Sequence, residues 1–196
     1  MLEKISNDLM EIINVSQHNS LFVAKIIAFL WVIQLINLIS GYRLNLLGIY
    51  PRTKKGLIGI ITCPFLHGNF GHLFFNSIPL FVLSCLILLK GQVFFCYLSV
   101  FIIIISGLLT WLLGRRAVHI GASSVIMGYF GFLLSQSYLN FSASSVITAI
   151  VCLYYFGGML FSFFPSVTGK NVSWEGHLFG FISGIMASFI IHYFYF

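Results

Sequence analysis

The stretch 93–113 reads VFFCYLSVFIIIISGLLTWLL and contains no charged side chain. An apolar run of about 20 residues spans the hydrocarbon layer of a bilayer when it is helical. The composition points the same way, because 59% of the 196 residues are hydrophobic and 7% are charged. An ordinary soluble domain has roughly 25% charged residues. The sequence therefore predicts an integral membrane protein built of helices.

Further apolar runs lie on both sides of this stretch, at 20–40, 72–89, 122–139, 146–164 and 174–196. Each is bounded by Gly, Pro, Ser, Asn or a charge, the residues that end helices and open loops. We expect an all-α polytopic membrane protein with six transmembrane helices in one domain over 20–196, after a polar lead-in over 1–19. Because successive spans alternate in direction, the second, fourth and sixth begin at the same membrane face.

The charges and cysteines exclude several classes of protein. The ten Lys and Arg residues outnumber the four Asp and Glu residues, which gives a net charge of +6, and they lie mainly in the polar stretches between the runs. Charge in those places is typical of membrane proteins and does not predict a nucleic-acid partner. The cysteines show no paired or metal-ligand spacing, so we expect neither a disulfide framework nor a bound metal or cofactor.

Polar side chains stand at the starts of the second, fourth and sixth runs. They are His72 and Asn76, then Ser123, then His177. Ionisable groups inside a membrane are costly and usually functional, although any one histidine can equally serve packing alone. The common direction of the three spans places these side chains at one depth.

Small residues recur at helical spacing along two of the spans: Ser124, Gly128, Gly131 and Ser135 in the fourth, and Gly176, Gly180, Gly184 and Ser188 in the sixth. Such stripes let membrane helices approach closely, and they are common in proteins without catalytic activity. Gly180 and Gly184 share a helical face with His177, so we expect the fourth and sixth spans to pack there. Phe181 is expected to face another direction.

These residue types are the parts of an acyl-transfer site. A serine hydroxyl within reach of a histidine ring can act as a nucleophile activated by a base. His72 and Asn76, four residues apart on one face, can both donate to a developing oxyanion, as can the free N–H groups where the helix of Ser123 begins. We expect a dyad of Ser123 and His177, and we expect Glu175 to be a solvated charge at the interface.

At these positions, from about residue 47 to 187, the chain resembles the rhomboid family of intramembrane serine proteases. The family's motifs read here as Gly121-Ala122-Ser123-Ser124, as His72 to Asn76, and as His177 with Gly180 and Gly184. The resemblance implies a six-helix bundle that cleaves transmembrane segments of other proteins, with Ser123 as the nucleophile and His177 as the base. His72, Asn76 and the Ser123 N–H would form the oxyanion hole.

The resemblance implies further roles. His67 would support the first connecting segment, and Gly121, Gly131, Gly180 and Gly184 would support the site. The fifth helix and the segment before the sixth would gate substrate entry, and the protein would lie in a bacterial inner membrane. The chain departs from the family at Ser124, where Gly is usual, and at Met127, where Tyr is frequent.

Other functions stay open at this point. A catalytically silent relative could bind membrane proteins without cutting them. The histidines would also suit a haem-binding electron carrier or a proton-relaying transporter, although the chain shows no internal repeat of the kind frequent in transporters. For the orientation we expect the topology that the resemblance implies, with the N-terminus inside, although the charges disagree with it. An N-terminus on the inside puts most Lys and Arg outside, against the usual rule; these are Arg43, Arg52, Lys54, Lys55, Arg115, Arg116 and Lys170.

Overall fold

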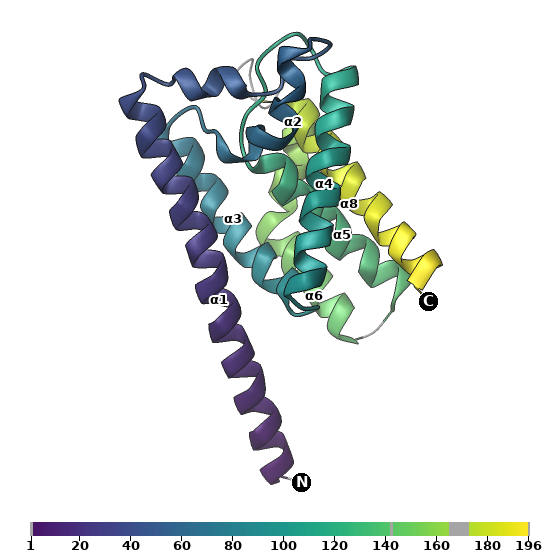
Figure 1. Ribbon diagram of the computed structural model, residues 1–196. Coiled ribbons are helices and arrows are strands. Elements are labelled where there is room, and N and C mark those ends of the chain that lie inside the picture. The colour runs from purple at the N-terminus through teal and green to yellow at the C-terminus, as the bar shows by residue number, and fades with distance from the viewer. Residues whose placement is uncertain (1, 142, 165–172, 196) are drawn as a thin grey trace.

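The structure is a computed structural model that describes residues 2–141, 143–164 and 173–195, with side chains over 17–141, 145–164 and 173–194. Lys170 and Phe196 therefore lie outside the described residues. The long elements in these ranges are all helices: α1 Leu2–Ile39, α3 Phe70–Leu88, α4 Gln92–Leu113, α5 Ser123–Leu139, α6 Ala143–Phe156 and α8 Trp174–Tyr195 (Figure 1). The all-helical fold class is confirmed.

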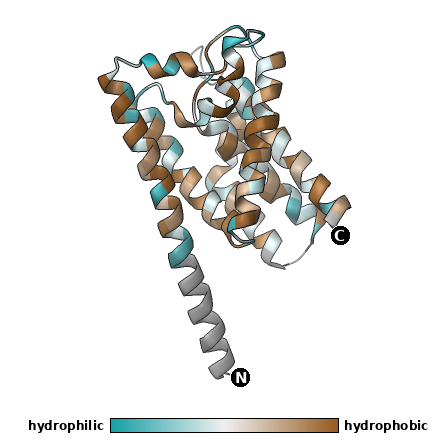
Figure 2. Ribbon diagram, in the orientation of Figure 1, coloured by the Kyte–Doolittle hydropathy of each residue, from teal (hydrophilic) through white to brown (hydrophobic). Residues whose placement is uncertain are grey.

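Five stretches are long and apolar enough to cross a membrane: Gln17–Ile39, Phe70–Leu88, Gln92–Leu113, Ser145–Phe163 and Trp174–Phe194. Large apolar side chains point outward along them, and Phe75 and Val93, for example, are 73% and 70% exposed. Figure 2 shows apolar colouring along the outer sides of several of these helices. Such surfaces suit contact with lipid, so the chain is an integral multi-pass membrane protein.

Helix α5 is not among these five stretches. It has 17 residues, fewer than the roughly 20 that a helix needs to cross the hydrocarbon layer. Its first eleven positions, 123–133, are all buried, because α3, α4, α6 and α8 pack around it. α5 is thus a central helix shielded by its neighbours, and the sixth crossing stays a prediction.

The N-terminal part of the chain is continuous with the first span. Helix α1 runs without a break from Leu2 to Ile39 and extends well beyond the rest of the bundle (Figure 1). The predicted lead-in over 1–19 and the predicted span over 20–40 therefore share one helical backbone. The division of the chain at residue 19 stays a prediction.

Short helices form the connection between α1 and α3: η1 Arg43–Leu47, η2 Lys55–Leu57, α2 Gly59–Thr62 and η3 Cys63–Phe65. The connection is fastened to the loop between α4 and α5 by an isolated bridge, in which Ile49 and His119 exchange backbone hydrogen bonds of 3.0 and 2.8 Å. Arg52 donates to the carbonyls of Leu112 and Gly114, both at 2.9 Å. These bonds satisfy carbonyls at the end of α4, where helical acceptors lack partners.

Candidate active site

Ser123 is the first residue of α5. The preceding Gly121 has a φ of +119°, in a region that side-chain-bearing residues avoid. The N–H of Gly121 donates to the carbonyl of Cys63 at 2.9 Å, and the N–H of Ala122 donates to Nε2 of His67 at 3.4 Å. The N–H of Ser123 follows at the helix start, where intrahelical acceptors are missing. It is therefore a suitable donor for an oxyanion.

His67 joins the connecting segment to this helix start. Because its Nε2 accepts the N–H of Ala122, a neutral ring must carry its proton on Nδ1. Burial, assisted by the neighbouring His72, lowers the pKa of His67 from 6.5 to about 3, so the ring is neutral at ordinary pH. The carbonyl of His67 accepts from the side chains of Asn37 and Asn45, each at 3.4 Å. His67 therefore links α1 and the connecting segment to the start of α5.

His72 and Asn76 project from the first turns of α3 toward the backbone before Ser123. Asn69 caps α3 by accepting the N–H of His72 at 2.7 Å, as N-cap residues commonly do. A Cβ atom placed on Gly121 would lie 2.9 Å from Nε2 of His72 and 3.6 Å from Nδ2 of Asn76. Both side-chain nitrogens therefore lie beside Gly121, two residues before the serine.

Asn76 is a buried donor without a partner. Its side chain is 8% exposed, and no hydrogen bond to Nδ2 occurs in the part of the chain that the structure describes. Leaving a buried amide unpaired usually costs about 1–3 kcal/mol. Such a group is available to an acceptor that arrives during a reaction.

Helices α5 and α8 meet backbone to backbone. A Cβ atom on Gly180 would collide with the carbonyl of Ser124, and one on Gly184 would collide with the carbonyl of Gly128. A Cβ atom on Gly131 would meet the backbone of Phe181 in the same way. This close approach is the geometry that small-residue stripes permit.

His177 lies in the first turn of α8, one turn before Gly180. Its Nδ1 forms a 2.7 Å hydrogen bond with the hydroxyl of Ser162, which belongs to the short helix η4, Gly157–Phe163. Among the described residues no hydrogen bond joins His177 to Ser123. Catalytic hydrogen bonds are often long in unliganded enzymes and shorten with substrate.

Glu175 differs from the expectation drawn from the sequence. Its side chain is 2% exposed, and its Oε1 accepts the backbone N–H of Arg115 at 3.2 Å and lies 3.4 Å from Nε of Arg115. The expectation of a solvated charge is therefore wrong, because the loop after α4 folds over the start of α8. Burial of a carboxylate requires such a partner.

His119, in the same loop, is bonded to the start of α8. Its Nε2 lies 3.0 Å from the carbonyl of Arg115, which can only accept, so Nε2 carries the proton. Its Nδ1 then accepts the hydroxyl of Ser173 at 2.6 Å, while that hydroxyl oxygen accepts the N–H of Gly176 at 3.2 Å. Burial lowers the pKa of His119. The loop that precedes Ser123 is thus tied to the turn that precedes His177.

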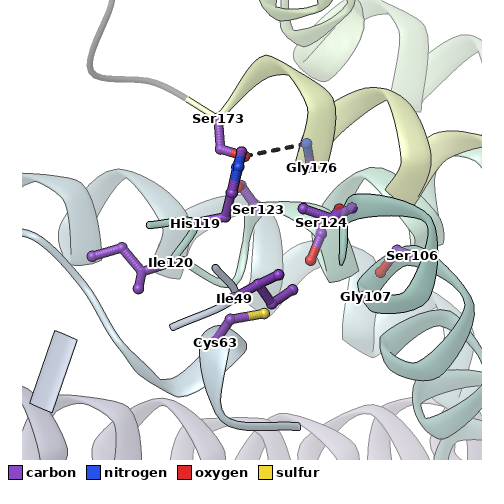
Figure 3. A pocket seen from close by; sticks show the side chains of 12 residues that line it. Ile49, Cys63, Ser106, Gly107, His119, Ile120, Ser123, Ser124, Ser173 and Gly176 are labelled. Carbon is purple, nitrogen blue, oxygen red and sulfur yellow. Dashed lines mark hydrogen bonds between the residues drawn. The ribbon is translucent and has the colours of Figure 1, made fainter. Parts of the chain in front are cut away.

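A small pocket borders Ser123 and Ser124 on the side of α4 (Figure 3). Ser106, Gly107 and Thr110 contribute to its wall, whereas His72, Asn76 and His177 do not. The Ser124 hydroxyl forms no hydrogen bond within the described ranges. The pocket therefore touches the candidate nucleophile but does not contain its candidate partners.

Comparisons with known proteins place the chain in a family. A family model described as the Rhomboid domain matches residues 54–194. An uncharacterized protein of Mycobacterium tuberculosis is 37% identical over 177 residues, which cover 86% of this chain and 73% of that protein. A similar protein of Mycobacterium leprae is 35% identical over 177 residues, with coverage of 86% and 70%. A putative rhomboid protein of Acanthamoeba polyphaga mimivirus is 28% identical over 139 residues, with coverage of 68% and 75%.

The family match includes the helix starts that carry His72, Ser123 and His177, and it includes the glycines at which α8 meets α5. The fold agrees, since the matched region contains helices long enough to cross a membrane. The chain belongs to the rhomboid family.

Proposed function

We propose that this protein is a serine endopeptidase that cleaves transmembrane segments of other membrane proteins within the lipid bilayer. The observation that carries the proposal is the convergence of three helix starts. The backbone before Ser123 lies beside the side-chain nitrogens of His72 and Asn76, and the backbone after it packs against Gly180 of α8. Rhomboid family membership supplies the class of chemistry, and the mycobacterial relatives favour a bacterial inner membrane.

In the proposed reaction, the Ser123 hydroxyl attacks the scissile carbonyl while Nε2 of His177 takes the hydroxyl proton. The carbonyl oxygen becomes an oxyanion that accepts from the N–H of Ser123 and the side chains of His72 and Asn76. His177 then gives the proton to the departing amine, which leaves an acyl-enzyme on Ser123. Water activated by His177 hydrolyses this ester and restores the serine.

The unpaired Nδ2 of Asn76 suits the role of oxyanion donor. A hydrogen bond that forms only as charge develops lowers the barrier, whereas a bond present equally in the ground state does not. Asn76 is buried in the resting structure without a partner, so its bond to an oxyanion would replace no existing protein bond. A donor fixed in a water-poor site is also worth more than the same donor in bulk water.

The direct test is cleavage of a reporter transmembrane protein by the purified protein in liposomes. Ser123→Ala and His177→Ala should each abolish cleavage while the melting temperature stays close to that of the wild type. In a soluble serine protease, loss of either group costs on the order of a millionfold. More than a few per cent of residual activity in either variant would refute the dyad. Tight binding of the reporter without cleavage by the wild type would favour a non-catalytic relative.

A further inference from the structure

We infer that Ser162 is a positioning residue that holds His177 in the tautomer required of a general base. The inference rests on the proposed function, because it concerns the histidine of the proposed dyad. Ser162 lies in η4, which follows α6 and is separated from α8 by residues 164–173. The rhomboid motifs quoted above do not include it.

The direction of the hydrogen bonds around Ser162 follows from a count of protons. A serine hydroxyl has one proton to donate, and that of Ser162 is donated to the carbonyl of Met159, which can only accept. Ser162 Oγ lies 2.7 Å from Nδ1 of His177, so the oxygen must accept and Nδ1 must carry the proton. A neutral imidazole has one N–H, which leaves Nε2 of His177 with a free lone pair.

The free lone pair on Nε2 is what a general base needs. In soluble Ser-His-Asp proteases an aspartate holds the corresponding N–H and fixes the tautomer. Here the carboxylate of Glu175, near the start of α8, instead accepts the backbone N–H of Arg115 and pairs with its guanidinium. In the described ranges no carboxylate is hydrogen-bonded to the His177 ring. Ser162 therefore takes the place of that aspartate, as a neutral acceptor for the Nδ1–H of His177.

The segment that carries Ser162 packs against α8, the helix of His177. The ring of Phe163 packs on Phe181 of α8 with centroids 5.4 Å apart, and Phe181 packs on Phe130 of α5 at 6.0 Å. The bond from Nδ1 of His177 thus depends on η4 lying against α8. Displacement of η4 would leave the ring free to change its tautomer.

Kinetics of Ser162 variants test this role. Ser162→Ala should lower kcat about tenfold, near the upper end of what one neutral hydrogen bond contributes, and leave KM almost unchanged. Ser162→Thr keeps the hydroxyl and should restore most of kcat. The matched control is Ser137→Ala, because the Ser137 hydroxyl also donates to a carbonyl three residues earlier, that of Leu134 at 2.7 Å, but contacts no histidine. An unchanged kcat in Ser162→Ala, or an equal loss in Ser137→Ala, would overturn the inference.

A spectroscopic measurement tests the same point without catalysis. In protein labelled with ¹⁵N-histidine, the His177 ring signals are assigned by their loss in His177→Gln. The wild type should show a neutral ring protonated at Nδ1, and Ser162→Ala should show the other tautomer or an exchanging mixture. An unchanged tautomer would overturn the inference even if kcat fell. If instead the wild type cleaved nothing, the proposed function would fail while the tautomer could still be read.

Discussion

The backbone of Gly180 in α8 lies directly against the carbonyl oxygen of Ser124, the residue after the proposed nucleophile. One turn earlier on the same helix stands His177. Lipid provides little hydrophobic drive for two helices to associate, so close backbone contact supplies much of the attraction between them. The contact at Gly180 therefore sets the distance between the proposed nucleophile and its base.

Substitution of Gly180 or Gly184 by Val should lower protease activity and thermal stability together. Each new side chain would overlap backbone atoms of α5, and the helices would have to separate. A displacement of about 1 Å can cost roughly a hundredfold in rate. Cleavage rates and melting temperatures of the purified variants provide the comparison. Met186→Val is the control, since Met186 is 41% exposed and faces away from this contact. If the glycine variants kept the wild-type cleavage rate and melting temperature, the contact between α5 and α8 could not be what positions the proposed dyad.

Phe181 would be a poor control, because the expectation that it faces another direction is wrong. Its ring packs between Phe130 of α5 and Phe163 of η4. The reason is helical geometry: residues four apart share a face, so Phe181 lies on the face of His177.

Asn76→Ala and His72→Ala should slow cleavage without abolishing it. Loss of one oxyanion donor usually costs about a hundredfold to a thousandfold, and the N–H of Ser123 would remain. For Asn76→Ala we also expect little loss of stability, because Nδ2 makes no hydrogen bond among the described residues. Steady-state rates and thermal melts separate the two effects. Full activity in Asn76→Ala would exclude it from the oxyanion hole.

Acid should destabilise the fold partly through His67. Burial lowers its pKa from 6.5 to about 3, so between these values the unfolded chain binds a proton that the folded chain does not. Stability therefore rises with pH across this window and is lost as pH falls from about 6.5 toward 3. In His67→Gln, whose amide oxygen can still accept the N–H of Ala122, the melting temperature should fall less over this window. Identical pH dependence in both proteins would contradict this role.

The departure at Ser124 should matter little to catalysis. Its hydroxyl lines the pocket beside α4 and forms no hydrogen bond in the described part of the chain, so it does not compete for the proposed base. Ser124→Gly should cleave the reporter at nearly the wild-type rate. A large gain in rate would show instead that the hydroxyl restrains Ser123.

Local patterns explain what the sequence could predict. Apolar length and boundary residues placed most helices within a few positions, since α4 was expected at 93–113 and spans Gln92–Leu113. The motifs named His72, Asn76, Ser123 and His177 as site residues, and these assignments remain proposals. The length of an apolar run could not predict the burial of helix α5. This helix has 17 residues, and its neighbours rather than lipid cover its first half.

Tertiary placement explains what the sequence could not predict. Ser162 stands between Phe161 and Phe163 in a stretch without a motif, and its bond to His177 exists because η4 lies against α8. From the sequence Glu175 is expected to be a solvated charge at the interface, yet the loop that carries Arg115 buries its side chain. In both cases the partner comes from an element distant in the sequence, so no local pattern marks the pair.

The most direct measurement is the reaction of the purified, folded protein with a fluorophosphonate probe, followed by identification of the modified residue by peptide mass spectrometry. We expect labelling at Ser123, none in Ser123→Ala, and strongly reduced labelling in His177→Ala. Absence of label at Ser123 in the folded wild type, or equal labelling of other serines, would contradict the account.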